Sequence, residues 1–272
     1  MRKHARWGSH VSGGLLLGLI GVLLLSGCAF GSAPTWQGVG PNAGSIVSLA
    51  VSSLNPPTLL AGTSGQGVFR SQDGGSTWKP VNTNLPSGII VNCIVLDPTQ
   101  IGLAYLGTSQ GVFLSTNYGD HWQSASQGLP GGADGAVTVL LVNLADPTTL
   151  YAGTAHKGVY ISHDGAKSWT VSAQGLPIGA TVHALLAETK GQQVLLFAAL
   201  AGSGVYQSGD DGASWSASST GLPVGSNGLS LLQQPTNPGG LYVGTNQGIY
   251  RSTDDGVSWK AVNDGLGSTP PQ

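Results

Sequence analysis

Acidic residues are the first candidates for catalysis, because glycoside hydrolysis needs two carboxyl groups roughly 5–10 Å apart. The chain has 12 Asp and Glu residues in 272. Most fall at repeated positions, where a turn role is expected, namely Asp73, Asp164, Asp210, Asp211, Asp254 and Asp255 in one motif and Asp97 and Asp146 in Asp-Pro-Thr turns. The remaining acids share no pattern: Asp120, Asp134, Glu188 and Asp264. We therefore expect a non-enzymatic protein, with a glycoside hydrolase as an alternative.

The sequence favours neither metal nor nucleophile chemistry. The histidines after the N-terminal segment lie far apart, without the spacing of metal ligands, at His121, His156, His163 and His183. No Gly-x-Ser-x-Gly motif stands between a strand and a helix. Cys93 lies in an apolar run and is expected to pack as a small buried side chain. We expect no catalytic residue, no metal and no cofactor.

The N-terminal 28 residues predict export. Three basic residues in the first six positions precede an uncharged apolar stretch at 13–25, shorter than the roughly 20 residues of a membrane-spanning helix. Leu25-Ser26-Gly27-Cys28 resembles a bacterial lipobox, whose Cys receives a diacylglycerol and becomes the first mature residue. We predict a lipoprotein signal peptide at 1–28, a linker at 29–34 and a lipid anchor on Cys28. An ordinary signal peptide is the alternative.

Composition limits the partners. The formal net charge is −2, and no basic run follows residue 6. Duplex nucleic acid is bound by cationic surfaces that displace its counterions, so nucleic acid is not expected as a partner. The chain also has 44 Gly, which indicates many turns.

An eight-residue motif, S-x-[DN]-x-[GA]-x-x-W, recurs about every 45 residues and is called the box below. The third residue is expected to accept hydrogen bonds within a tight turn: Asp73, Asn117, Asp164, Asp210 and Asp254. The final residue is expected to fill the space between sheets: Trp78, Trp122, Trp169, Trp215 and Trp259. Both positions are therefore predicted to be structural.

Four strands per repeat are expected around the boxes. Alternating apolar runs supply one strand each at 46–51, 90–96, 136–142, 182–186 and 229–232, two more precede each box, and the Trp segment gives the fourth. The pattern predicts an all-β propeller of about five four-stranded blades over 35–267, essentially without helix, and a disordered tail at 268–272. Our first choice is a closed ring with Trp36 in an extra strand. The alternative is an incomplete arc of a larger propeller, or one completed by a second chain.

The boxes resemble BNR or Asp-box repeats, which occur in sialidases, sortilin-type receptors, some glycoside hydrolases and the photosystem II assembly-factor family. The sialidase resemblance implies three arginines that bind a carboxylate. Only Arg70 and Arg251 follow Cys28, so sialidase activity is not expected. The assembly-factor resemblance implies a chaperone or assembly role for membrane complexes.

Two loop families are expected to meet on one face of such blades, opposite the boxes. Their candidate binding residues are Gln66, Gln110, His156, Lys157, Asn246 and Gln247. We predict a binding or scaffold protein on the outer face of the bacterial cell membrane or another envelope membrane, with an unknown envelope protein or glycan as partner. Carbohydrate binding is the alternative, and Tyr118, the one aromatic inside a box, would support it if exposed beside a groove.

Overall fold

The structure is a computed structural model that describes residues 38, 40–41, 44–52, 57–190, 193–235 and 239–266. The chain divides into two units, Met1–Gly38 and Val39–Gln272, and the strands of the described residues lie in the second. The predicted signal peptide, Cys28, the linker, Trp36 and the C-terminal tail lie outside the described residues.

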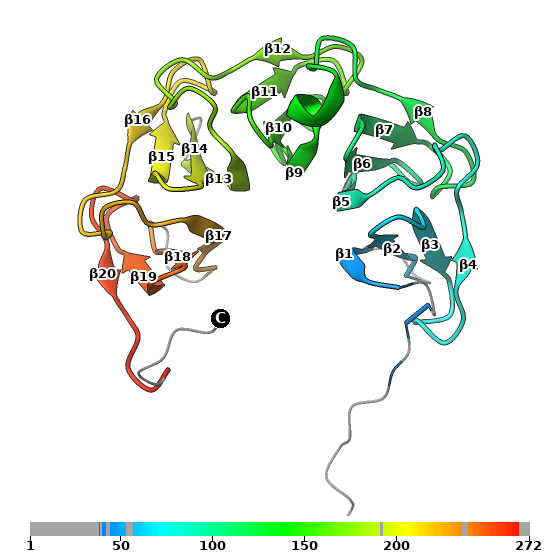
Figure 1. Ribbon diagram of the computed structural model, residues 1–272, viewed down its shortest axis with the longest axis horizontal. Coiled ribbons are helices and arrows are strands. Elements are labelled where there is room, and N and C mark those ends of the chain that lie inside the picture. Colours follow the sequence, from blue (N-terminus) through cyan, green and yellow to red (C-terminus); the bar gives the residue numbers. More distant parts are fainter. Residues whose placement is uncertain are drawn as a thin grey trace, which may run out of the picture. The chain divides into compact units, whose positions relative to one another are not determined.

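The second unit contains five four-stranded antiparallel sheets, here called blades 1 to 5 in chain order (Figure 1). Blade 1 consists of β1 (Ile46–Val51), β2 (Leu59–Thr63), β3 (Val68–Ser71) and β4 (Lys79–Pro80). Blade 2 consists of β5 (Val91–Leu96), β6 (Ala104–Thr108), β7 (Gly111–Ser115) and β8 (Gln123–Ser124). Blade 3 consists of β9 (Val137–Val142), β10 (Leu150–Thr154), β11 (Val159–Ser162) and β12 (Thr170–Val171). The all-β propeller fold predicted from the repeat is therefore confirmed.

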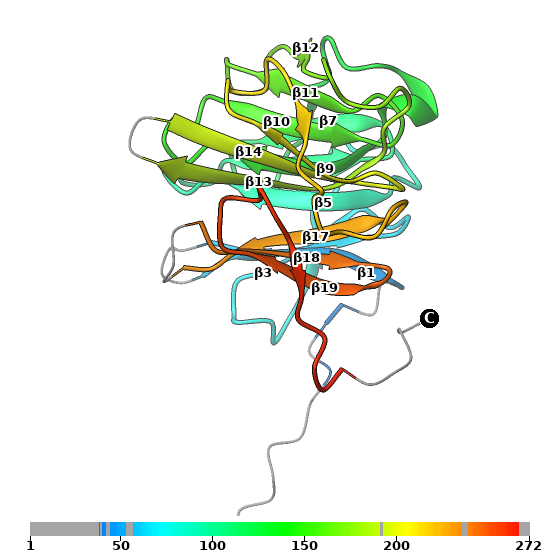
Figure 2. The same cartoon turned by 90° about the vertical axis from the view of Figure 1, so that its left-hand side faces the viewer.

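The last two blades follow the same order. Blade 4 consists of β13 (Val182–Lys190), β14 (Gln193–Leu200), β15 (Gly204–Ser208) and β16 (Ser216–Ala217). Blade 5 consists of β17 (Gly228–Gln233), β18 (Leu241–Thr245), β19 (Gly248–Ser252) and β20 (Lys260–Ala261). The hairpin of β13 and β14 is longer than its counterparts and extends beyond them in Figure 2.

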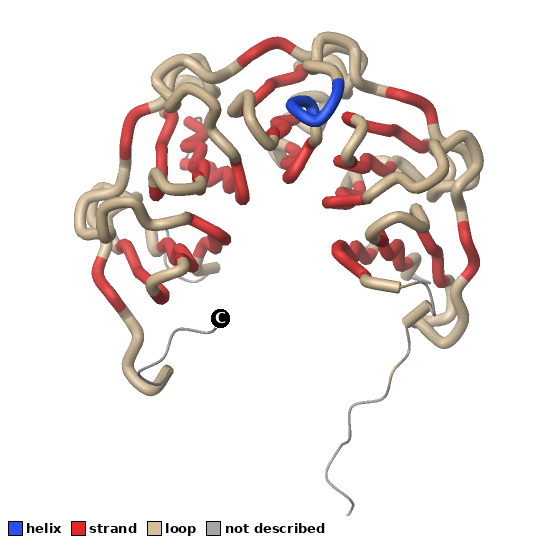
Figure 3. The backbone as a smooth tube through the Cα atoms, viewed as in Figure 1, coloured by secondary structure: helices blue, strands red, loops and turns tan. Residues whose placement is uncertain are grey.

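Two details differ from the sequence expectation. Each fourth strand is only two residues long and begins immediately after the box Trp, because the Trp itself belongs to the turn that enters the strand. Figure 3 shows short strands joined by loops, with one helical turn among the described residues, the 3₁₀ turn η1 at Gly132–Gly135.

The core is divided among the blade interfaces. Four clusters of buried side chains each lie between two consecutive blades, so blades 2 to 4 pack with both faces of the sheet and blades 1 and 5 with one. The innermost strands β1, β5, β9, β13 and β17 pack side by side in that order. Among the described strands this packing does not return from β17 to β1, and Figure 1 shows the two strands on opposite sides of a gap. The structure is thus an open arc, the second of the two arrangements expected.

Candidate functional site

The box turns use their own polar groups. In blade 1, Ser71 Oγ donates to Asp73 Oδ1 (2.8 Å) and accepts the N–H of Gly75 (2.8 Å), while Thr77 N donates to Asp73 Oδ1 (2.9 Å). The corresponding bonds occur in the other boxes, including the one in which Asn117 replaces Asp. The third residue therefore closes the turn in each box, as the sequence suggests.

Hydrogen bonding also sets the charge of these carboxylates. The hydroxyl four residues further on donates to the second carboxylate oxygen, and it is the largest cause that lowers the pKa of Asp73, Asp164, Asp210 and Asp254 to about 2. A general acid must hold a proton near the working pH. The box carboxylates are therefore ionised turn residues and are unsuited to that role.

The box tryptophans join neighbouring blades. The indole N–H of Trp122 donates to the carbonyl of Val81 in the preceding blade (2.8 Å). Trp169, Trp215 and Trp259 donate in the same way to Ala125, Ser172 and Ser218. These four side chains are at most 5% exposed, whereas Trp78 is half-buried and donates to Gly75 inside its own box (3.0 Å). The tryptophans therefore belong to the scaffold.

A second set of bonds joins the blades near the axis. Each inner strand has a bulge after its first pair, and in β5, β9 and β13 the bulged residue bonds to the next blade. Asn92 Nδ2 donates to the carbonyl of Val137 (2.8 Å), and His183 Nδ1 lies 2.9 Å from the carbonyl of Gly228. Because that carbonyl can only accept, Nδ1 carries the hydrogen.

The bulged residues also line a shallow pocket. It has a volume of about 360 Å³ and is bordered by Asn92, Thr138, His183 and Leu229. The sequence analysis did not identify this set, although its members follow the first residue of each inner strand at the repeat spacing. Three of the four side chains bond to backbone carbonyls, so their main role is to hold consecutive blades together.

Each predicted binding loop is held by a Thr, which is buried in blades 1 to 3 and half-buried in blade 5. In blade 3, Thr154 Oγ1 accepts the N–H of Lys157 (3.0 Å) and donates to the carbonyl of Gly158 (2.8 Å). The same pair of bonds forms in blades 1, 2 and 5. All six predicted tip residues are exposed: Gln66, Gln110, His156, Lys157, Asn246 and Gln247. The backbone of each tip is therefore fixed while its side chain faces solvent.

Both loop families meet on one face. The β10–β11 turn bonds to the segment that leads into blade 3, through Ala155 N and the carbonyl of Ala136 (3.0 Å). Lys157 forms an ion pair with Asp134 in η1 (3.2 Å), so one predicted tip is already paired within the protein. In blade 4 the corresponding turn contains Gly202 and Ser203 and has no long polar side chain.

The acids outside the repeated motifs lie in different blades. Asp120 pairs with Arg70 (2.8 Å) and Asp134 with Lys157, while Asp264 is exposed in a turn after β20. Glu188 in β13 is 1% exposed and accepts the N–H of Gly239 (2.8 Å). Asp120, Asp134 and Glu188 are thus each held by a separate local contact.

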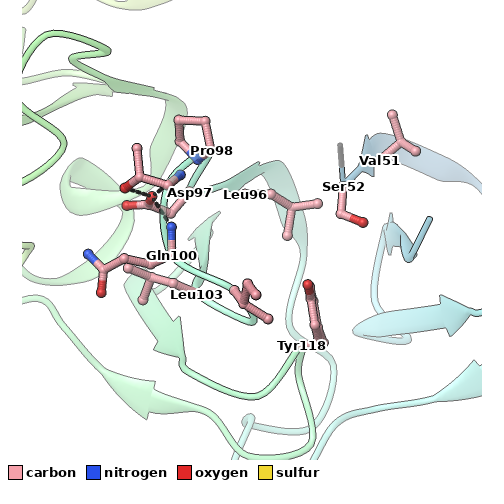
Figure 4. Close-up of a pocket in the computed structure, with 10 residues that line it drawn as sticks. Val51, Ser52, Leu96, Asp97, Pro98, Gln100, Leu103 and Tyr118 are labelled. Carbon is pink, nitrogen blue, oxygen red and sulfur yellow. Dashed lines mark hydrogen bonds between the residues drawn. The ribbon is translucent and has the colours of Figure 1, made fainter. Parts of the chain in front are cut away.

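A pocket of about 180 Å³ lies between blades 1 and 2 on the face that carries the boxes (Figure 4). Val51 and Ser52 border it from blade 1, and the β5–β6 turn at 97–101 and Tyr118 border it from blade 2. Tyr118 is half-buried, and its backbone is held by bonds to Gly102 (2.9 Å) and from Arg70 (3.2 Å). Tyr118 thus lines a hollow, but it is half-buried and not exposed as the carbohydrate alternative required.

Comparison with known proteins supports the fold. The sequence model of the Sortilin-Vps10 family, described as "Sortilin, neurotensin receptor 3", matches residues 66–177, which is less than half of the chain. Among curated proteins, none matches the chain. The match agrees with the predicted resemblance to sortilin-type propellers.

Solved propellers give the same result. The GH74 xyloglucanase from Xanthomonas campestris is similar at TM-score 0.63 and 19% identity, over 79% of this chain and 38% of that chain. The extracellular domain of a putative hybrid two-component system from B. thetaiotaomicron is similar at TM-score 0.60 and 18% identity, over 78% and 27%. The chain therefore spans less than two fifths of these proteins. At such identities the likeness shows the fold alone.

No three His, Cys, Asp or Glu side chains of the described residues come together in an arrangement that would hold a metal ion. No helix in the same ranges has the length and apolar character needed to cross a membrane.

Proposed function

We propose that this protein is a non-enzymatic binding or scaffold propeller, exported and held at the outer face of an envelope membrane by a lipid on Cys28. Its binding surface is the loop face, formed by the β2–β3, β6–β7, β10–β11 and β18–β19 turns. The similarity to extracellular sensor domains supports an exported binding role.

One observation carries this proposal. Polar side chains at the tips of these turns face solvent, while the Thr beneath each tip fixes the backbone. A rigid turn with an exposed polar side chain loses little backbone freedom when it binds. The carboxylates of the opposite face are mostly committed to box turns, which supports a binding role over a catalytic one.

The partner is an envelope protein or a protein complex in the membrane. The tips carry amide groups and one imidazole, with Lys157 neutralised by Asp134, so the surface offers hydrogen bonds and little net charge. A short tether at 29–34 would keep the loop face near the membrane. A protein that assists the assembly of membrane complexes would need its binding surface there. We regard hydrolysis as outside its function.

Site-specific photo-crosslinking in cells tests the surface. A photoreactive residue at Gln110 or His156 is compared with one at Ser76 or Lys167, which are equally exposed in boxes of the opposite face. We expect discrete crosslinked products from the first pair only. Equal products from both faces, or none from the loop face, would contradict the proposal.

The anchor has its own test. The Cys28→Ser variant should leave the membrane fraction, because removal of the thiol prevents attachment of the diacylglycerol. Unchanged retention in the membrane after alkaline washing would rule out a lipid anchor at this position while leaving the loop-face proposal open to its own experiment.

A further inference from the structure

The backbone of Tyr118 has an uncommon conformation. Its φ is 55°, in the left-handed region that bulky side chains rarely adopt. The same box position is occupied by Gly74, Gly165, Asp211 and Asp255, all with similar φ values. Gly adopts this conformation without strain and Asp tolerates it, whereas Tyr does not favour it. Blade 2 therefore places an aromatic ring where the turn itself would prefer a smaller residue.

The ring forms a wall of the pocket between blades 1 and 2. Figure 4 shows the Tyr118 side chain pointing toward Leu96, with Val51 and Ser52 of blade 1 on the other side. Ile101, which is 74% exposed, lies at the same pocket. An aromatic ring and aliphatic side chains thus surround a small hollow. Strain that positions a side chain in a hollow is a reason to look for a ligand there.

Polar groups face the same pocket. Ser52 Oγ accepts the N–H of Thr58 (2.9 Å), which leaves its own hydrogen to donate. Asp97 Oδ1 accepts the N–H groups of Thr99 (2.8 Å) and Gln100 (2.9 Å). Its Oδ2 is buried and has no hydrogen-bond partner within the part of the chain that the structure describes. A buried carboxylate oxygen without a partner is unusual, and this one is closed off from the pocket as well as from solvent.

We propose that this pocket, here called the Tyr118 pocket, binds one pyranose ring of a carbohydrate. A sugar ring has an apolar face of C–H groups, which fits against Tyr118 and Leu96, and a rim of hydroxyls, which fits the Ser52 hydroxyl and the exposed Gln100 amide. The volume of about 180 Å³ is below the roughly 300–1,000 Å³ of drug-sized sites, so the occupant is a single ring. The site lies opposite the loop face and is independent of the function proposed above.

Sugar binding to the purified full-length protein tests this proposal. The probes are the methyl glycosides of glucose, galactose, mannose and N-acetylglucosamine, titrated by saturation-transfer NMR. We expect saturable binding of at least one of them with a roughly millimolar Kd, because a ligand of this size makes few contacts. Adenosine serves as an aromatic comparison. The proposal would be overturned if none of the four glycosides bound, or if adenosine bound and the glycosides did not.

Two variants assign the binding to the pocket. Tyr118→Gly introduces the residue that blades 1 and 3 have at this position, so the fold should keep or raise its Tm while sugar affinity falls at least about tenfold. Tyr118→Phe keeps the ring and should retain most of the affinity. Equal affinity in the wild-type protein and Tyr118→Gly would show that the sugar binds elsewhere and would overturn the proposal.

Discussion

The interior blade interfaces and the two ends of the arc contain equivalent residues in different surroundings. Leu49 in β1, Ile94 in β5 and Leu140 in β9 occupy the same register position. Ile94 and Leu140 are 9% and 5% exposed, because a preceding blade covers them, whereas Leu49 is 64% exposed. At the other end, Leu232 in β17 is 63% exposed. Each repeat thus has two apolar faces, and the first and last repeats each have one that no other described blade covers.

This difference shows what stabilises the fold. Within a blade, short antiparallel strands supply the backbone hydrogen bonds, but the apolar burial and the tryptophan bonds occur between blades. The stability of such a repeat array is close to a sum of nearest-neighbour interfaces. Substitutions in the interior should therefore be costly, and the same substitutions at the ends should be mild.

The tryptophans should show the largest contrast. We expect Trp122→Ala to lower the free energy of unfolding by about 3–5 kcal/mol, because a buried ring is lost and Val81 loses its indole donor. Trp78→Ala, in a half-buried position, should cost clearly less. Urea denaturation of both variants measures the difference. Equal losses would mean that the end of blade 1 is as well packed as the interior.

The inner-strand leucines provide the next comparison. Leu140→Ser should cost about 2–5 kcal/mol, since it leaves a cavity and buries a hydroxyl between blades 2 and 3. Leu49→Ser, at the equivalent exposed position, should change the free energy of unfolding by no more than about 0.5 kcal/mol. The same denaturation experiment applies. A large loss for Leu49→Ser would show that this face is covered in solution.

Strand glycines test how closely the sheets approach. A Cβ at Gly153 would lie 2.6 Å from Cγ1 of Val139 in the same blade and 2.7 Å from Cγ1 of Val182 in the next blade, so it would clash with both. At Gly244 in blade 5 the close contact is with Ser230 Oγ (2.5 Å), a side chain of the same blade. We expect Gly153→Ala to cost about 1–3 kcal/mol and Gly244→Ala less. Thermal unfolding measures both variants. A larger loss of stability for Gly244→Ala than for Gly153→Ala would argue against tight packing in the interior.

The box carboxylates should give the smallest effect. Hydrogen bonds from Ser168 and Ser162 hold the pKa of Asp164 at about 2, below its ordinary value of 3.8. A lowered folded-state pKa gives stability that is present above pH about 4 and is lost as the pH falls through about 2. Asp164→Asn should therefore reduce the fall in Tm between pH 4 and pH 2. Asn117→Asp should increase it, because blade 2 lacks this titration. Identical pH profiles for all three proteins would contradict the role of these bonds.

Much of the fold was predictable because the repeat is explicit. The spacing of Asp73, Asp164 and their counterparts located each turn, and the apolar runs located the inner strands within one or two residues, except for β13, which continues to Lys190. Its extension depends on contacts with the next blade, where Lys190 pairs with Asp255. A local pattern does not reveal such a contact.

Two features were harder to predict from the sequence: whether the blades close into a ring, and the Tyr118 pocket. Sequence spacing shows which blades are neighbours, but the curvature of the arc depends on how side chains such as Leu140 and Val95 fit between sheets. The Tyr118 pocket is lined by Ser52 and Asp97 from separate blades, 45 residues apart, and only the fold brings them together. Its one sequence signal was the aromatic residue inside a box.

Hydrogen–deuterium exchange of the intact protein tests the central contrast between interior and ends most directly. The amides of Leu49, Ile94 and Leu140 share one register, so their exchange rates compare packing at equivalent backbone positions. We expect Leu49 to exchange much faster than Ile94 and Leu140. Equal protection at all three positions would contradict the account, because it would mean that the end of the arc is covered as the interior is.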